Sequence, residues 1–127
     1  MNKDKLTEVG IYPQKFNDIL GVQIPTEKIY VSNGLVIHLY KHGHTDCIQH
    51  LSNLSDIIAH PDYIGVNPNE VGDSVELVKV YNDNILIGLK LDRDVNEGFY
   101  LYVSTMYTIQ EQKLNRRLHS GRLKKCS

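Results

Sequence analysis

The sequence predicts an α+β domain: amino-terminal helices packed on a roughly four-stranded antiparallel sheet, with a short carboxy-terminal helix and a basic tail. Two observations lead to this prediction. Helix signals gather in the first half of the chain, whereas the second half holds three segments rich in β-branched and aromatic residues, at 74–81, 85–92 and 98–107. The length of 127 residues and a hydrophobic content of 41% suit one core, so residues 1–127 are expected to form a single domain.

The start of the chain gives few signals, and the first clear ones come after it. Residues 1–27 are weakly patterned, although "KFNDIL" at 15–20 indicates a short helix. Residues 29–31 are expected to be extended. A helix is then predicted from residue 34 or 35 to residue 42, and Gly43 is a natural terminator for it.

A second helix is predicted in "TDCIQHLSNLSDIIAHP", with Thr45 or Asp46 as its amino-terminal cap and Pro61 beyond its end. The apolar residues that fall on one stripe of this helix are Ile48, Leu51, Leu54, Ile57 and Ile58. A short strand or turn follows around Ile64, and Gly65 begins a run of loop signals. The first half therefore supplies the helical layer.

The second half changes to the period of strands. "NDN" at 82–84 suits a tight hairpin, and "DRDVNEG" at 92–98 suits a longer one, so the three strands are expected to pair as an antiparallel meander. A final helix is predicted from residue 109 to 118. The chain then ends in the basic tail.

Composition excludes several classes of protein. No run of 18 apolar residues occurs, which argues against a membrane span, and residues 1–10 lack the apolar region of a secretory signal. Cys47 and Cys126 form neither a disulfide framework nor a CxxC pair. The expected location is the cytoplasm, either where the protein is made or in a target cell that receives it.

The net charge of −1 hides a strong asymmetry along the chain. Residues 1–112 carry eight basic and all fifteen acidic side chains, a net charge of −7, whereas residues 113–127 carry six Lys and Arg and no acid. A basic tail of this kind can bind phosphate groups. It can equally be a solvated helix end whose cations complement the helix dipole.

"HLYKHGH" at 38–44 places three histidines within seven residues. His38 and His42 are four apart, so they share one face if the segment is helical. The spacing suits a zinc site, an acid–base pair or an ordinary amphipathic helix. Zinc is disfavoured because the HExxH pattern is absent and Asp46 is the one carboxylate near the cluster. No metal and no cofactor is expected.

Acid–base catalysis is the chemistry that two histidines serve without tuning, because their pKa lies near neutrality. Cleavage of RNA without a metal needs a base for the ribose 2′-OH, an acid for the leaving oxygen and fixed positive charge at the phosphorus. His38 and His42 could be that pair, and Lys79 or Arg122 could supply the charge. The alternative is one buried structural histidine and one at the surface.

The segment "YVSTMY" leaves a similar choice open. Strand alternation places Thr105 on the same face as Leu101 and Val103, which indicates a packed threonine, but its position near the strand end leaves room for a site. The eight tyrosines could offer surface for base stacking. Residues 120–122 are expected to be ordered and to lie beside the last strand and the helix of His38 and His42, because Gly121 gives the backbone freedom to turn.

Six segments in order resemble a known family: "VIHLYKHGH", "IIAHPDYIG", "SVELVKVY", "ILIGLKL", "YLYVSTMY" and "LHSGRLKK". They are similar to the phage-associated barnase–EndoU–colicin–RelE-like (BECR fold) nuclease domains, over residues 28–125. The resemblance implies a helical amino-terminal part on a four-stranded antiparallel sheet, and a metal-independent RNase of the kind found among prophage and bacterial-conflict toxins.

The resemblance also implies the functional residues of this chain. The implied catalytic residues are His38, His42, Lys79, Thr105 and Arg122. The expected substrate contacts are Ser120, Tyr107 and Lys113.

The leading hypothesis is an endoribonuclease that makes a 2′,3′-cyclic phosphate, with RNA as substrate and a cognate immunity or antitoxin protein as a further partner. The alternative is a phage accessory module that binds RNA or protein without cutting it.

Overall fold

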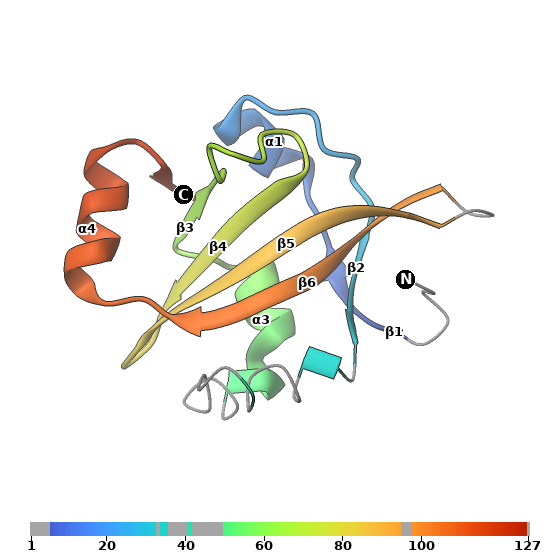
Figure 1. Ribbon diagram of the computed structural model, residues 1–127, viewed down its shortest axis with the longest axis horizontal. Helices are drawn as coiled ribbons and strands as arrows, with labels where there is room; N and C mark the ends of the chain where they lie inside the picture. The colour runs from blue at the N-terminus through green and yellow to red at the C-terminus, as the bar shows by residue number, and fades with distance from the viewer. Residues whose placement is uncertain (1–5, 33, 36–40, 42–49, 95–97, 127) are drawn as a thin grey trace.

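The computed structural model describes residues 6–32, 34–35, 41, 50–94 and 98–126 (Figure 1). The strands are β1 (Leu6–Ile11), β2 (Lys28–Ser32), β3 (Tyr63–Gly65), β4 (Ser74–Val80), β5 (Asn84–Asp94), β6 (Gly98–Thr108) and β7 (Leu123–Lys125). The helices include α1 (Gln14–Leu20), α3 (Leu54–Ala59) and α4 (Glu111–His119). The expected α+β class is confirmed.

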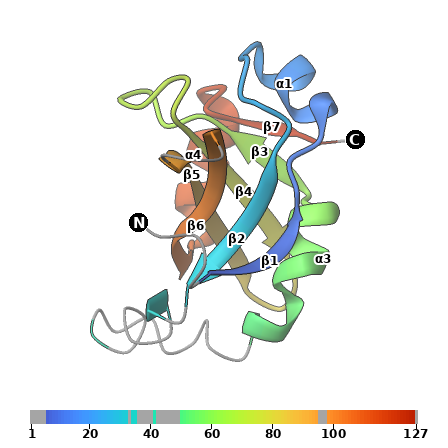
Figure 2. The ribbon, with the colours of Figure 1, turned by 90° about the vertical axis from the view of Figure 1, so that its right-hand side faces the viewer.

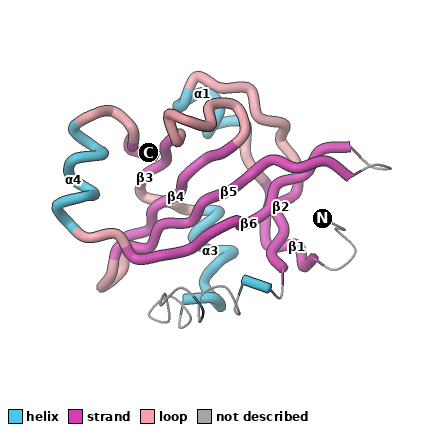
Figure 3. The backbone as a smooth tube through the Cα atoms, viewed as in Figure 1, coloured by secondary structure: helices cyan, strands magenta, loops and turns pink. Residues whose placement is uncertain are grey.

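All seven strands belong to one sheet, with the order β1-β2-β6-β5-β4-β3-β7. β2 and β6 run parallel, and every other neighbouring pair is antiparallel. The four-stranded antiparallel sheet predicted from the sequence is therefore too small and lacks the parallel pair. The predicted strands β4, β5 and β6 form the centre as a meander, and Figure 3 shows β5 and β6 running side by side through the middle of the molecule.

The end of the basic tail forms a strand at the edge of the sheet. Residues 123–125 form β7, which pairs with β3 from Tyr63 to Gly65. Four strands separate β7 from β2 in the sheet order, and β5, β4 and β3 lie between it and β6. β7 therefore does not pair with β6, because the short strand β3 offers a free edge that residues 123–125 complete.

One face of the sheet carries the main hydrophobic core. Alternate residues of the central strands point to it, and helices α1 and α3 cover it. The largest side chains from the helices are Phe16, Ile57 and Ile58, all at most 1% exposed. We call this side of the sheet the core face.

The other face is covered at one end by α4 and is more polar. A smaller cluster lies here, made of Val78, Leu86, Ile109, Leu114 and Leu123. Figure 2 shows α3 and α4 on opposite sides of the sheet. We call this second side the α4 face. It is the face on which polar side chains of the central strands meet.

The predicted helices fare differently. The helix at 15–20 is confirmed as α1, and the helix at 109–118 is confirmed as α4, one or two residues further along. The end of the second predicted helix is confirmed as α3. The part of that helix before residue 50, and most of the helix predicted up to residue 42, lie outside the described residues.

No helix in the described part of the chain has both the length and the apolar character needed to cross a membrane.

Candidate active site

A hollow of about 340 Å³ opens on the α4 face over strands β4, β5 and β6. Two of the residues predicted as catalytic, Thr105 and Arg122, line it together with the predicted substrate contact Tyr107. The carboxylate of Glu76 lies in the same hollow, which we call the Glu76 hollow. Residues far apart in the sequence thus converge at one place.

Glu76 is buried in the middle of β4 and is held by two arginines. Its residue exposure is 6%. Nη1 of Arg117, on α4, lies 3.2 Å from Oε2, and Nη2 of Arg122 donates a hydrogen bond to Oε1. A buried carboxylate is costly unless it is paired and hydrogen-bonded, and here each oxygen has its own guanidinium. The result is a fixed cluster of one negative and two positive charges.

Arg122 reaches this cluster because the chain turns sharply after α4. Ser120 caps the helix end, its Oγ accepting a hydrogen bond from the Arg122 N–H at 3.4 Å. Gly121 follows with φ of 86°, a left-handed conformation that favours glycine. The expectation that Gly121 lets the tail turn back is confirmed, and residues 120–122 are described.

Gly65 fixes the position of Arg122 from the neighbouring strand. A Cβ built at Gly65 would lie 2.2 Å from the carbonyl oxygen of Arg122 and 2.7 Å from Cδ2 of Leu123. The contact is with backbone, so any side chain at residue 65 would push β7 away. Gly65 is therefore part of the machinery that places the Arg122 guanidinium over Glu76.

Thr105 lines the hollow because β6 contains a bulge. Gly88 pairs with Thr105, and the next residue of β5, Leu89, pairs with Val103, so Ser104 is the extra residue. The prediction that Thr105 shares a face with Leu101 and Val103 is wrong for this reason. Beyond the bulge the alternation is inverted, and Met106, not Thr105, enters the core.

The close approach of Thr105 depends on Gly88. A Cβ at Gly88 would meet Cγ2 of Thr105 at 2.8 Å and Oγ of Ser104 at 3.4 Å. The Ser104 hydroxyl instead donates to the Gly88 carbonyl at 3.1 Å. The floor of the hollow is thus a glycine, with two hydroxyl side chains above it.

The other predicted substrate contacts lie around the two arginines. The Tyr107 hydroxyl accepts a hydrogen bond from Nη1 of Arg117 at 3.5 Å, and Nζ of Lys113 lies 5.9 Å from the centre of the Tyr107 ring. Lys113 and Ser120 line a second, basic hollow that shares Arg122 with the first. Tyr107 and Lys113 are thereby connected to the Glu76 cluster.

An exposed ion pair stands at the rim of the Glu76 hollow. Nζ of Lys90 lies 3.2 Å from Oε1 of Glu70, and both side chains are more than a third exposed. Hydrogen bonds from Lys90 first and then from Ser74 lower the pKa of Glu70 below its ordinary value. Glu70 is therefore a second anionic group beside the arginine cluster.

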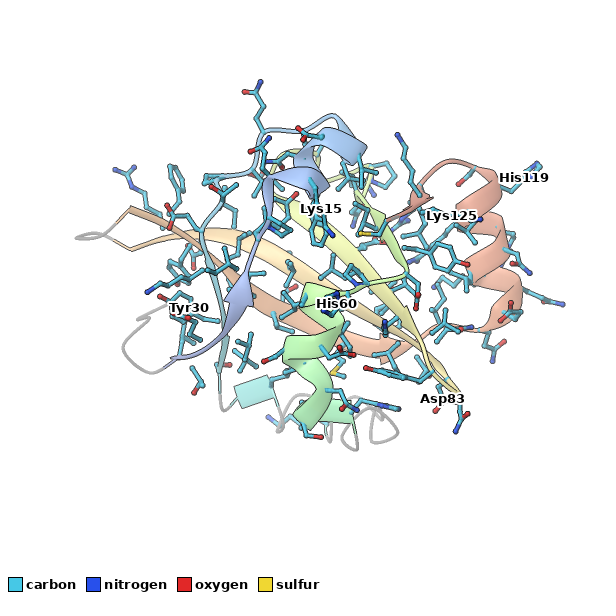
Figure 4. The ribbon with its side chains drawn as sticks, turned by 180° about the vertical axis from the view of Figure 1, so that it is seen from behind. Lys15, Tyr30, His60, Asp83, His119 and Lys125 are labelled. Atoms are coloured by element: carbon cyan, nitrogen blue, oxygen red, sulfur yellow. The ribbon has the colours of Figure 1, made fainter. Side chains whose placement is uncertain are left out.

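Lys79 does not join the site. It shares one face of β4 with Val75 and Leu77, so it belongs to the core face. Its Nζ donates a hydrogen bond to the carbonyl of His60 at 2.7 Å. Figure 4 views the molecule from behind and shows His60 on the α3 side of the sheet. Lys79 and Arg122 therefore lie on opposite faces.

The predicted histidine pair, His38 and His42, lies outside the described residues. The described histidines are His50, His60 and His119, and none of these three lines the Glu76 hollow. His119 is on the outer side of α4, directed away from the sheet (Figure 4). A histidine at this site would have to come from the segment of His38 and His42.

Glu76 and Arg117 belong to this cluster but are not among the residues predicted from the sequence. A signal for Glu76 was present, because it is a charged residue at the centre of an apolar strand and shares its face with Ser74. Arg117 had no comparable signal. It is one of several cations on a short helix, and the tertiary fold alone selects it over Arg116.

Within the described residues, no three His, Cys, Asp or Glu side chains gather closely enough to hold a metal ion. The site is instead built around arginines. Such a set of groups can bind a phosphate by paired hydrogen bonds and can stabilise negative charge on it.

The family model described as phage-Barnase-EndoU-ColicinE5/D-RelE like nuclease3 matches residues 7–116. No curated protein and no solved structure matches the chain significantly. The matched region contains Glu76, Thr105 and Tyr107, and it ends within α4. The chain belongs to this phage-associated, BECR-like nuclease family.

Proposed function

We propose that the chain is a metal-independent endoribonuclease that cleaves RNA at the Glu76 hollow. The 2′-oxygen of a ribose attacks the adjacent phosphorus, the bond from phosphorus to the 5′-oxygen breaks, and a 2′,3′-cyclic phosphate remains. The observation that carries the proposal is the convergence of Arg117 and Arg122 on the buried carboxylate of Glu76.

Glu76 is the group best placed to act as general base. It is a carboxylate inside a polar hollow, and a hydroxyl that enters the hollow comes within reach of it. It would take the proton of the 2′-OH as the new bond to phosphorus forms. The leaving 5′-oxygen needs a proton in return, and His38 or His42 remains the predicted donor.

Arg117 and Arg122 supply the fixed positive charge. Negative charge grows on the phosphate oxygens as the fifth bond forms, and guanidinium groups that are already in place stabilise it without reorganisation. Arg122 also has unused donor capacity, since its Nε is buried and has no hydrogen-bond partner among the described residues. An unsatisfied buried donor is costly, which favours a bound phosphate oxygen.

The hydroxyl groups around the arginines suit the same substrate. Thr105 and Tyr107 border the hollow from β6, and each can donate to a phosphate or ribose oxygen. The arginines provide the charge that a metal ion provides in other nucleases, and this supports cleavage without a metal.

The experiment is cleavage of a defined RNA in excess EDTA by the wild type, Glu76→Gln and Arg93→Ala. Glutamine keeps the size, and its single oxygen can accept a hydrogen bond from one of the two arginines, but it cannot take a proton. Loss of a general base costs about 10²–10⁴ in rate, so Glu76→Gln is expected to fall by that amount. Arg93 is exposed near the end of β5, away from the hollow. Arg93→Ala is therefore the control for loss of one positive charge and is expected to keep full activity.

Two further measurements identify the product end and test whether the 2′-OH of the substrate is needed. The proposal requires a 2′,3′-cyclic phosphate end and no cleavage at a position where the 2′-OH is replaced by hydrogen. Full activity of Glu76→Gln would remove Glu76 as the base. RNA binding without any cleavage by the wild type would favour the non-catalytic binding module.

The phage association of the family supports a role as a toxin with an antitoxin partner. Growth of bacteria that express the wild type or Glu76→Gln examines this role. Arrested growth with the wild type alone is the expected result, and equal growth of both strains would contradict it.

A further inference from the structure

A second hollow, the basic hollow, adjoins the Glu76 hollow at α4. Four cations line it, namely Lys113, Arg116, Arg117 and Arg122, together with the hydroxyl of Ser120. No described acidic residue lines it. It is therefore a concave surface of one sign of charge, which attracts anions more strongly than scattered charges on a convex surface do.

The helix dipole accounts for only part of this set of cations. Arg116 and Arg117 lie in the last turn of α4, where cations are favoured, but Lys113 lies in the first turn, where the dipole disfavours a positive charge. Arg117 is already engaged with Glu76. Arg116 is exposed, and its side chain makes no ion pair or hydrogen bond with the described part of the chain.

The two hollows are joined by the same side chains. Arg122 lines both, and Arg117 lines the basic hollow while it contacts Glu76. A phosphate bound between these arginines therefore has the basic hollow directly beside it. Consecutive phosphates of a nucleic acid strand are neighbours of this kind.

We infer that the basic hollow is a second phosphate subsite, which takes the backbone phosphate next to the one that is cleaved. This inference rests on the proposed function, because it assigns the Glu76 hollow to the cleaved phosphate. Lys113 and Arg116 hold the second phosphate, which lies beside Ser120. The enzyme then favours a strand with two or more phosphates over a dinucleotide with one.

The experiment measures binding and does not depend on turnover. Oligonucleotides with 2′-O-methyl groups, which have no attacking hydroxyl, are titrated as a dinucleotide with one phosphate and as a trinucleotide with two. The wild type is expected to bind the trinucleotide about tenfold more tightly, since each phosphate contact adds favourable counterion release. In the double variant Lys113→Ala/Arg116→Ala, the gain is expected to fall below about twofold.

The salt dependence of binding and a matched control variant distinguish a phosphate subsite from general electrostatic attraction between the protein and RNA. The slope of log K against log salt for the trinucleotide is expected to shrink by about 0.7 in the double variant, one phosphate contact on a single strand. Lys124→Ala removes an exposed cation from β7 outside the hollow, and it is expected to keep the tenfold gain. A full gain in the double variant, or an equal loss in Lys124→Ala, would overturn the inference.

Failure of the proposed function gives a different result. If RNA is not cleaved but the trinucleotide gain depends on Lys113 and Arg116, the subsite stands and the cleavage proposal fails. If RNA is cleaved with dependence on Glu76 but the gain is the same in both proteins, the subsite alone fails.

Discussion

The two faces of the central sheet use the same strands for opposite purposes. On the core face, Val75, Leu77 and Ile87 are 0% exposed and pack against helices. On the α4 face, the neighbouring positions hold Glu76 and Gly88, a buried charge and a residue without a side chain. Both faces contribute apolar packing, but only the α4 face also carries the charged cluster of the candidate site.

The α4 face carries a desolvation cost that the apolar packing of the core face does not have. Burying Glu76 between two arginines gives less net stability than apolar residues of similar volume often would, because all three charges lose water. The cost is confined to the α4 face, where α4 and β7 bring the arginines in. The core face remains apolar and supports this arrangement from below.

Removal of one cation from each face is expected to give the largest difference between the two faces. Arg122→Ala is expected to lower the cleavage rate by about 10²–10³, the usual effect of losing one preorganised donor to a charged transition state. The cleavage rate of Arg122→Lys is expected to lie between those of the wild type and Arg122→Ala, since a lysine keeps the charge but cannot donate two parallel hydrogen bonds. Lys79→Ala is expected to leave the rate nearly unchanged. Initial rates with a fluorescent RNA measure all three.

The same three variants can contradict the assignment. If Lys79→Ala loses as much activity as Arg122→Ala, the active face is not the α4 face. If neither matters, the cation is supplied by a different residue.

Two leucines of equal size provide the next comparison. Leu77 is buried on the core face, and Leu86 is buried on the α4 face, where it lines the Glu76 hollow. Truncation of either to alanine is expected to cost about 2–5 kcal/mol in the free energy of unfolding. Denaturant unfolding gives these values.

Activity separates the two leucine variants. Leu77→Ala is expected to keep the rate per folded molecule, whereas Leu86→Ala enlarges the hollow and is expected to lower that rate. Equal rates in both folded variants would mean that the shape of the hollow does not matter for cleavage.

Two glycines offer a subtler contrast. Gly65→Ala is expected to displace the backbone of Arg122, costing about 1–3 kcal/mol, because the added Cβ meets a carbonyl and not a side-chain tip. In Gly10→Ala the new Cβ would lie 2.9 Å from Cγ2 of Ile58, a side chain on α3. Stability is expected to fall in both variants. The cleavage rate of the folded protein is expected to fall in Gly65→Ala alone. Activity that survives in Gly65→Ala would show that β7 is not needed to place Arg122.

Much of this arrangement follows from sequence patterns, and the exceptions have physical causes. The strands β4, β5 and β6 follow from β-branched and aromatic residues with clear turns between them. β1 was missed because residues 1–27 show little alternation, and β7 because "LKK" has one apolar residue. These edge strands form through pairing with β2 and β3, which local sequence does not encode.

Part of the candidate site could also be predicted from the sequence. Arg122, Thr105 and Tyr107 were identified, and they do line one hollow. The face of Thr105 was not predictable, because a period of two cannot reveal the bulge at Ser104. Lys79 lies two residues beyond Leu77 on β4, so strand alternation alone places it on the core face with Val75 and Leu77.

The smallest effect concerns the ion pair at the rim of the hollow. Lys90, and after it Ser74, lower the pKa of Glu70, so the folded protein binds this proton less readily than the unfolded chain does. The contribution to stability is therefore present above the ordinary pKa of glutamate and is lost as the pH falls through the lower folded value. NMR titration of the Glu70 carboxyl should show a midpoint below the ordinary glutamate value, moving back toward it in high salt.

Because Glu70 and Lys90 are both solvent-exposed, water and salt screen their interaction, and its effect on folding should be slight. Lys90→Gln removes the first cause of the shift and is expected to raise the Glu70 midpoint while the unfolding midpoint at neutral pH hardly moves. The contrast with Glu76 then becomes quantitative, since both glutamates pair with cations on the α4 face but only Glu76 is buried. A large loss of stability in Lys90→Gln would mean that the rim is as tightly built as the Glu76 cluster, and that the polar face is not divided into a rigid centre and a solvated edge.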